Sequence, residues 1–189
     1  MSMPLLIIVS GPPASGKTTL ARQVARELGL PFIYKDGIKE TLFDSLGWQD
    51  RAWSKKLGLA TYRLLYYFLE AELAAGQSLV VESNFAPIAT TEFKRLQEKY
   101  TFRPFQVMCR ADGKALIERY CARANDPGRH PGHVDLETLA EIKPVLTRGY
   151  LDPLDIGGEI VEIETTDFSK IDVAGIVSRL RTALEESKK

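Results

Sequence analysis

The stretch Gly11-Pro-Pro-Ala-Ser-Gly-Lys-Thr18 constrains this chain more than any other, because it fills every fixed position of the pattern G-x-x-x-x-G-K-[ST]. An apolar run of strand length, residues 5–10, comes directly before it. After it, Leu20, Val24 and Leu28 recur at the spacing of one helical face. Strand, glycine loop and helix in this order predict a phosphate-binding loop.

The residue types of this loop predict its chemistry. Gly11 and Gly16 allow the backbone to curl, so that successive amide hydrogens face an anion together with the positive end of the following helix. Lys17 is expected to reach the β- and γ-phosphates of a nucleoside triphosphate, and the Thr18 hydroxyl to ligate Mg²⁺. We therefore predict ATP and Mg²⁺ as cofactors. The expected nucleotide contacts in this segment are Gly11, Ala14, Ser15, Gly16, Lys17, Thr18 and Thr19.

Composition limits the remaining possibilities. The chain has 189 residues, 44% of them hydrophobic, and is most simply one domain spanning residues 1–189. Its formal net charge is zero, so a nucleic-acid partner is possible but not favoured. Neither a membrane-length apolar run nor a signal-type start is found, which predicts a cytoplasmic protein without a membrane partner. The sequence leaves monomer and dimer open.

Five strands are expected to form a parallel sheet with helices on both faces. Their predicted ranges are residues 5–10, 32–34, 78–82, 102–109 and 159–164. Helices are expected over residues 38–46, 54–75, 87–100 and 171–184, and over residues 136–150 with a bend or a restart at Pro144. A further helix is expected after its cap Asp112, with Leu116, Ile117 and Tyr120 on one face. The fold class is therefore α/β, a P-loop NTPase three-layer sandwich with an arginine-bearing lid.

Polar residues follow the predicted second and third strands. Asp36 comes after residues 32–34, and Glu82 closes an apolar strand with Asn84 two positions later. The carboxyl ends of parallel strands meet at one edge of the sheet, where ligands bind. We expect Glu82 to hydrogen-bond groups that bind Mg²⁺ directly, without itself contacting the ion. Asp36, Lys39 and Asn84 are expected to contact the second substrate.

Three arginines surround a loop rich in proline and glycine. Arg119 and Arg123 are four residues apart and share a helical face, and Arg129 follows in the loop. We predict a closing lid over about residues 123–136, with Arg119 on the nucleotide and the other two arginines on the transferring phosphoryl group. His130, in the same loop, is predicted to contact the substrate. The alternative is a solvated basic face.

The order of these features resembles the small P-loop kinases, in the group that holds chloramphenicol phosphotransferase, zeta-type toxins and the kinase half of polynucleotide kinases. The resemblance implies that Asp36 takes the proton from an acceptor hydroxyl, and that Arg123 and Arg129 are lid arginines. It also implies that Thr166, in the loop after the last strand, touches the adenine. One departure concerns the acceptor: Gly37 and Ile38 follow Asp36 where related kinases often have a second acid or an arginine.

The predicted activity is transfer of the ATP γ-phosphate to a hydroxyl of a small molecule, nucleoside or nucleotide. A regulatory ATP-binding module and a 5′-hydroxyl polynucleotide kinase remain as alternatives. The sequence lacks the Asn-Lys-x-Asp motif with which a GTPase switch reads its base. Its length leaves no room for the separate lid domain of an AAA+ motor. Trp48, Trp53 and Tyr62 are weaker candidates for lining an acceptor pocket.

Overall fold

The structure is a computed structural model that describes residues 3–187. Its centre is a five-stranded sheet in the order β2-β3-β1-β4-β5, and every neighbouring pair is parallel. The strands are β1 (Leu5–Ser10), β2 (Phe32–Tyr34), β3 (Leu79–Glu82), β4 (Arg103–Arg110) and β5 (Glu159–Glu164). The predicted parallel sheet of five strands is therefore confirmed.

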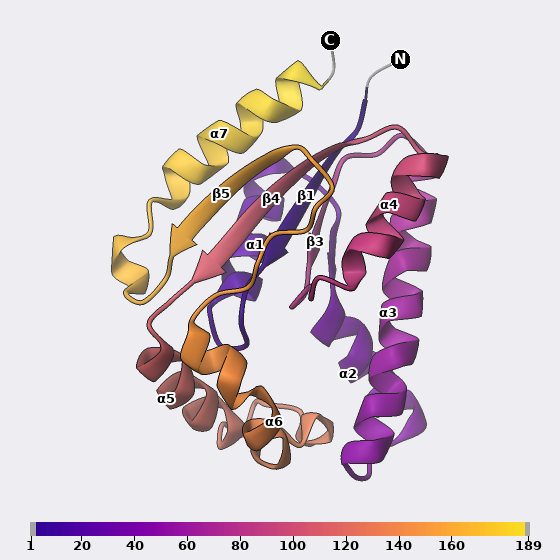
Figure 1. The fold of residues 1–189 in the computed structure, drawn as a ribbon. Coiled ribbons are helices and arrows are strands. Elements are labelled where there is room, and N and C mark those ends of the chain that lie inside the picture. The colour runs from indigo at the N-terminus through magenta and orange to yellow at the C-terminus, as the bar shows by residue number, and fades with distance from the viewer. Residues whose placement is uncertain (1–2, 188–189) are drawn as a thin grey trace.

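Seven α-helices and two short 3₁₀ turns connect and cover the strands (Figure 1). The helices are α1 (Lys17–Leu28), α2 (Lys35–Leu46), α3 (Arg51–Ala74), α4 (Ala89–Lys99), α5 (Gly113–Ala124), α6 (Asp135–Arg148) and α7 (Val173–Glu186). The 3₁₀ turns are η1 (Pro131–His133) and η2 (Phe168–Lys170).

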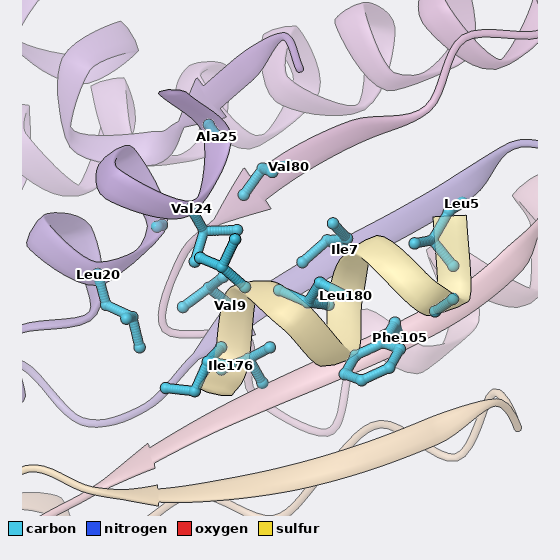
Figure 2. Packing of buried hydrophobic residues seen from close by; sticks show 14 of the residues in the cluster. Leu5, Ile7, Val9, Leu20, Val24, Ala25, Val80, Phe105, Ile176 and Leu180 are labelled. Carbon is cyan, nitrogen blue, oxygen red and sulfur yellow. The ribbon is translucent and has the colours of Figure 1, made fainter. Parts of the chain in front are cut away.

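The side chains of β1 point alternately to the two faces of the sheet and so contribute to two separate core layers. Because successive side chains of a strand point to opposite faces, Leu5, Ile7 and Val9 pack on one side, where α1 and α7 cover the sheet (Figure 2). Leu6 and Ile8 pack on the other side against α3 and α4. All five are fully buried, so β1 is enclosed on both faces, as expected for the central strand of a three-layer sandwich.

A third, smaller cluster holds the lid together at the carboxyl end of the sheet. Leu116 and Tyr120 of α5 pack with Leu146 of α6, and η1 lies between the two helices in the chain. In Figure 1 this pair occupies the end of the molecule at which the strand arrows point, across from α2. The lid therefore lies over the edge of the sheet that carries the phosphate loop.

Several helices differ from the sequence prediction, among them α2, α3 and α6. Helix α2 begins at Lys35 and so includes Asp36 in its first turn. Helix α3 begins at Arg51, because the Asp50 side chain accepts a hydrogen bond of 2.8 Å from the Trp53 amide and caps it. Helix α6 continues through Pro144 without restarting. Proline removes one backbone donor, but Pro144 and Ala140, whose carbonyl loses its partner, are both exposed to water.

Among residues 3–187, none of the helices combines the length and the apolar character that a membrane crossing requires.

Candidate active site

The phosphate loop joins β1 to α1 through a backbone that requires glycine at two positions. Gly11 has φ +156°, and a Cβ there would lie 2.5 Å from the Cys109 carbonyl oxygen. Gly16 has φ +78°, and a Cβ there would lie 2.3 Å from the ring of Phe168. Ala14 is also left-handed, with φ +64°. Gly16 caps α1 without a side-chain hydrogen bond, which leaves the first amides of the helix available to an anion.

Lys17, Thr18 and Glu82 contact one another beside this loop. The Thr18 hydroxyl donates a 2.8 Å hydrogen bond to the Glu82 carboxylate. The Lys17 ammonium lies 3.6 Å from the same carboxylate and 3.4 Å from the Pro12 carbonyl oxygen. Glu82 is buried at the carboxyl end of β3, and burial raises its pKa despite the opposing charge of Lys17. No cluster of three His, Cys, Asp or Glu side chains able to hold a metal ion occurs among the described residues.

Two buried polar atoms have no hydrogen-bond partner within the described part of the chain: the Ser15 hydroxyl of the phosphate loop and Nε of Arg123 in the lid. Buried polar atoms are normally paired, so both atoms favour a bound anionic ligand. Thr19 is exposed and lies outside the cavity that forms beside the loop.

That cavity measures about 220 Å³ and opens between the phosphate loop, α2, the start of α3 and the lid. Asp36, Lys39, Asn84, Arg123 and Arg129 all line it, as does Lys17. With Glu82, which also lines the cavity, the sequence thus identified seven residues that converge on it from four separate parts of the chain.

Asp36 lies in the first turn of α2, at the carboxyl end of β2. Its carboxylate is 3.2 Å from the Lys35 ammonium and 3.3 Å from the Arg129 guanidinium. Burial opposes its ionisation, but Lys35, His133 and Arg129 together hold the pKa of Asp36 well below its usual range. Asp36 is therefore a carboxylate at neutral pH, able to accept a hydrogen bond from a hydroxyl group.

The predicted lid segment contacts α2 through ionic and aromatic side chains. Arg129 binds Asp135 at 2.6 Å and also lies 3.5 Å from Glu40. Gly132 packs against Phe43 so closely that a Cβ would lie 2.7 Å from the ring. These contacts seat the lid over the side of the cavity that Asp36 lines.

The two lid histidines have different surroundings. His130 stacks on Phe43 at 5.0 Å, lies 3.2 Å from Asp44 and is not among the cavity-lining residues. These contacts attach His130 to α2, and its predicted substrate contact stays a prediction. His133 is buried in the cavity wall, with Nε2 2.7 Å from Glu40.

Arg119 and Thr166 belong to a second cluster beside the phosphate loop. Arg119 donates to the Thr165 carbonyl at 2.9 Å and to the Thr166 carbonyl at 2.5 Å. Its guanidinium also stacks 4.1 Å above the Phe168 ring, which covers Gly16. These contacts hold the segment after β5 next to the loop, where the sequence predicted an adenine contact for Thr166. That contact and the role of Arg119 stay predictions.

Several lining residues were not predicted from the sequence. They are Pro13, Lys35, Arg51, Ser83, Tyr120, His133, Asp135, Thr138 and Ile142. Lys35 adjoins Asp36, and Asp135 follows the predicted lid arginines, so proximity in sequence was an available signal for those two. Trp48, Trp53 and Tyr62 do not line the cavity; Tyr62 instead hydrogen-bonds Ser83 at 2.9 Å behind it.

The fold and the phosphate loop define a P-loop nucleotide-binding protein. Residues 6–148 match the model of a protein family described as an AAA domain, and the chain belongs to that family. The matched region runs from β1 to the end of α6. It therefore includes the phosphate loop, Asp36, Glu82 and the lid.

Two solved structures illustrate the relationship. A proposed kinase from Chloroflexus aurantiacus is 41% identical, with a TM-score of 0.87 over 95% of this chain and 98% of that one. A sugar kinase from a Janibacter species is 17% identical, with a TM-score of 0.56 over 97% of this chain and 95% of that one, which shows the fold alone. The predicted kinase-like P-loop fold is confirmed at this level.

Curated relatives match only in part. The cytidylate kinase of Ignicoccus hospitalis is 40% identical over 42 residues, which are 22% of this chain and 24% of that protein. This chain covers no more than 24% of the length of the curated relatives it matches.

Proposed function

We propose that this chain is an ATP- and Mg²⁺-dependent kinase that moves the γ-phosphate to a hydroxyl group of a small molecule. One observation carries the proposal: the ionised Asp36 carboxylate shares a cavity with Lys17 of the phosphate loop and Arg129 of the lid. A carboxylate is not needed for nucleotide binding there, because it would repel the phosphates. It suits an acceptor hydroxyl placed in line with the γ-phosphate.

The residues of the loop fit a nucleoside triphosphate with magnesium. The uncapped start of α1, the unpartnered Ser15 hydroxyl and the Lys17 ammonium would hold its phosphates, and Thr18 with Glu82 would hold the metal. Bound MgATP supplies the phosphoryl group and the positive charge that offsets its oxygens. The similarity to the Chloroflexus protein, itself proposed to be a kinase, supports the same assignment.

Asp36 orients the acceptor and receives its proton. The acceptor hydroxyl donates a hydrogen bond to the carboxylate, which points the oxygen lone pair at the phosphorus. Because the pKa of Asp36 is low, the proton passes late, as the new oxygen–phosphorus bond forms. A loose transition state needs little assistance from a strong base, so positioning is the larger contribution of this residue.

The lid arginines stabilise charge and keep water out. Nε of Arg123 has no hydrogen-bond partner among the described residues. The side chain of Arg129 is largely buried, with an exposed fraction of 14%. Guanidinium groups in this position neutralise charge on the transferring oxygens. The contacts of η1 with Phe43 close the cavity, which limits hydrolysis of the nucleotide.

The size of the cavity favours a small acceptor over a polynucleotide. At about 220 Å³ it holds a few small functional groups beside the phosphate loop, below the usual range for drug-sized ligands. Zero net charge also gives little electrostatic attraction for a long nucleic acid.

The test is ATP consumption with Mg²⁺ against a panel of hydroxyl compounds: sugars, sugar acids, nucleosides, nucleotides, aminoglycosides, chloramphenicol and a 5′-hydroxyl oligonucleotide. We expect one small acceptor to raise turnover and to gain a phosphate. Asp36→Asn should lower kcat by roughly 10²–10⁴ with ATP affinity retained, the usual size of a general-base contribution.

Asp155→Asn is the matched control, because Asp155 is exposed and pairs only with Lys94 on α4. ATP hydrolysis that no hydroxyl compound changes would contradict the proposal and favour a regulatory ATP-binding module. Phosphate transfer to the oligonucleotide alone would favour a polynucleotide kinase.

A further inference from the structure

Lys39 is the cavity lysine that has no carboxylate within 4 Å among residues 3–187, although its ammonium lies 5.2 Å from the centre of the Phe43 ring. It lies one turn after Asp36 on α2 and its exposed fraction is only 5%. Its Nζ donates a 2.8 Å hydrogen bond to the Ser54 hydroxyl, a neutral partner. An ammonium has three donors, so this bond leaves two for a group inside the cavity.

The other cavity cations each have a carboxylate within 4 Å. The pairs are Lys17 with Glu82, Lys35 with Asp36, Arg51 with Glu141, Arg123 with Asp135, and Arg129 with Asp135. Within residues 3–187, Lys39 has no such partner. An unpaired buried charge is costly, and such groups occur at binding and catalytic sites.

Helix α3 makes room for this ammonium group. Ser54 and Gly58 are four residues apart and share one face of α3, and a Cβ on Gly58 would lie 3.9 Å from Lys39 Nζ. Arg51, on the first turn of the same helix, also lines the cavity. Lys39 and Arg51 thus add positive charge on the α2–α3 side, whereas Lys17 faces Glu82 on the phosphate-loop side.

We propose that Lys39, assisted by Arg51, binds an anionic group of the acceptor, so that the acceptor carries a carboxylate or a phosphate as well as the hydroxyl held by Asp36. The inference rests on the proposed kinase function and specifies its substrate class. Both anions offer the oxygen acceptors that the two free ammonium donors need. The one-turn separation of Asp36 and Lys39 would place the hydroxyl and the anion on the same small molecule.

Matched compounds that differ in one group test this subsite. Suitable sets are glycerol, glycerate and glycerol 3-phosphate; glucose, gluconate and glucose 6-phosphate; and cytidine with cytidine monophosphate. For the set that is phosphorylated, we expect an anionic member to exceed the neutral one in kcat/KM by about tenfold to hundredfold, the usual effect of one charge-assisted hydrogen bond. The carboxylate and phosphate members separate the two sources of the anion.

Lys39→Met removes the charge and keeps the length of the side chain. We expect it to abolish the preference for the anionic member by raising the KM of that member. Lys39→Arg should restore part of the preference. Lys94→Met, at the exposed ion pair with Asp155, is the control. A preferred neutral acceptor, or an equal loss for every acceptor and for ATP hydrolysis, would overturn the subsite.

Calorimetric binding of the same sets, with a non-hydrolysable ATP analogue, separates this inference from the kinase proposal. Binding of an anionic member to the wild type but not to Lys39→Met, without any phosphate transfer, would support the subsite and contradict the kinase. Transfer to a neutral acceptor in preference to its anionic counterparts, in the wild type and in Lys39→Met alike, would support the kinase and contradict the subsite. Neither binding nor transfer would contradict both.

Discussion

The guanidinium of Arg129 in the lid lies 3.3 Å from the carboxylate of Asp36 on α2. The same side chain binds Asp135 at 2.6 Å, so one residue ties the closed lid to the carboxylate that would hold the acceptor. Arg129 therefore places positive charge beside Asp36 and contributes to its low pKa. The position of Arg129 and the pKa of Asp36 are therefore coupled.

Arg129→Ala should reduce phosphate transfer far more than ATP binding. The change removes charge stabilisation, which for a catalytic arginine contributes on the order of 10³-fold in kcat, and also the tie between lid and α2. We expect the KM for ATP to change less than about threefold, because the phosphate loop is unaffected. Steady-state kinetics at varied ATP checks this, with Arg181→Ala on the exposed face of α7 as the control. A large rise in KM with unchanged kcat would instead make Arg129 a ground-state contact.

Glu82→Gln should raise the Mg²⁺ concentration required for ATP binding. The amide keeps the size of the carboxylate and can still accept the Thr18 hydrogen bond, but it lacks the charge that orients metal ligands. Loss of such an outer partner lowers metal affinity by about 10–100-fold. A titration of nucleotide binding against Mg²⁺ measures the shift. Glu98→Gln on the exposed face of α4 is the control, and an unchanged Mg²⁺ requirement would remove Glu82 from this role.

Strong local patterns predicted most of the fold. The apolar run of β1 and the alternation of β5 gave bounds identical to the observed ones, Leu5–Ser10 and Glu159–Glu164. The start of α2 was wrong because Gly37 reads as a helix breaker. In the structure Gly37 is needed there, since a Cβ would lie 2.4 Å from the Tyr34 ring. Tyr34 is the N-cap residue of α2, so this local contact favours glycine in the first turn despite its low helix propensity.

Site residues could be predicted where they lie at the end of a strand or within a recognisable motif. Lys17, Asp36 and Glu82 each come at the carboxyl end of a strand or in the phosphate loop, so topology alone brings them together. Arg51 and His133 carry no such signal. Arg51 reaches the cavity because α3 begins against α2, and His133 because η1 folds onto Phe43. Helix crossings and loop packing of this kind are not encoded in a short sequence pattern.

Lys39→Met should stabilise the protein at neutral pH. Burial, helped by Lys35, Arg51 and Arg129 and opposed by Asp36, lowers the pKa of Lys39 from 10.5 to about 8. That difference corresponds to about 3 kcal/mol of destabilisation, and loss of the Ser54 hydrogen bond offsets part of it, leaving a net gain of about 1–2 kcal/mol. The expected rise in Tm is about 3–6 °C.

The lowered pKa of Lys39 also predicts how the stability difference between Lys39→Met and the wild type changes with pH. Below about pH 8 both the folded and the unfolded chain hold the Lys39 proton, so the destabilisation is complete. Between about pH 8 and 10.5 the unfolded state binds more protons, and the contribution of Lys39 to stability rises with pH. The Tm advantage of Lys39→Met over the wild type should therefore shrink from pH 7 to pH 10. A variant less stable than the wild type at every pH would contradict this account.

Gly132→Ala should hold the lid away from α2. The added Cβ would lie 2.7 Å from the Phe43 ring, and overpacking of this kind costs about 1–3 kcal/mol. Because Gly132 belongs to the lid turn, we expect the strain to open the lid, with phosphate transfer falling roughly 5–100-fold and the hydrolysed fraction of ATP rising. Measuring product phosphate against released phosphate gives both values. Phe43→Leu in the same chain should restore transfer by making room for the methyl group, while Phe43→Leu alone serves as the control. Equal losses of transfer and hydrolysis, without rescue by the second change, would mean that Gly132 acts on overall folding and not on lid closure.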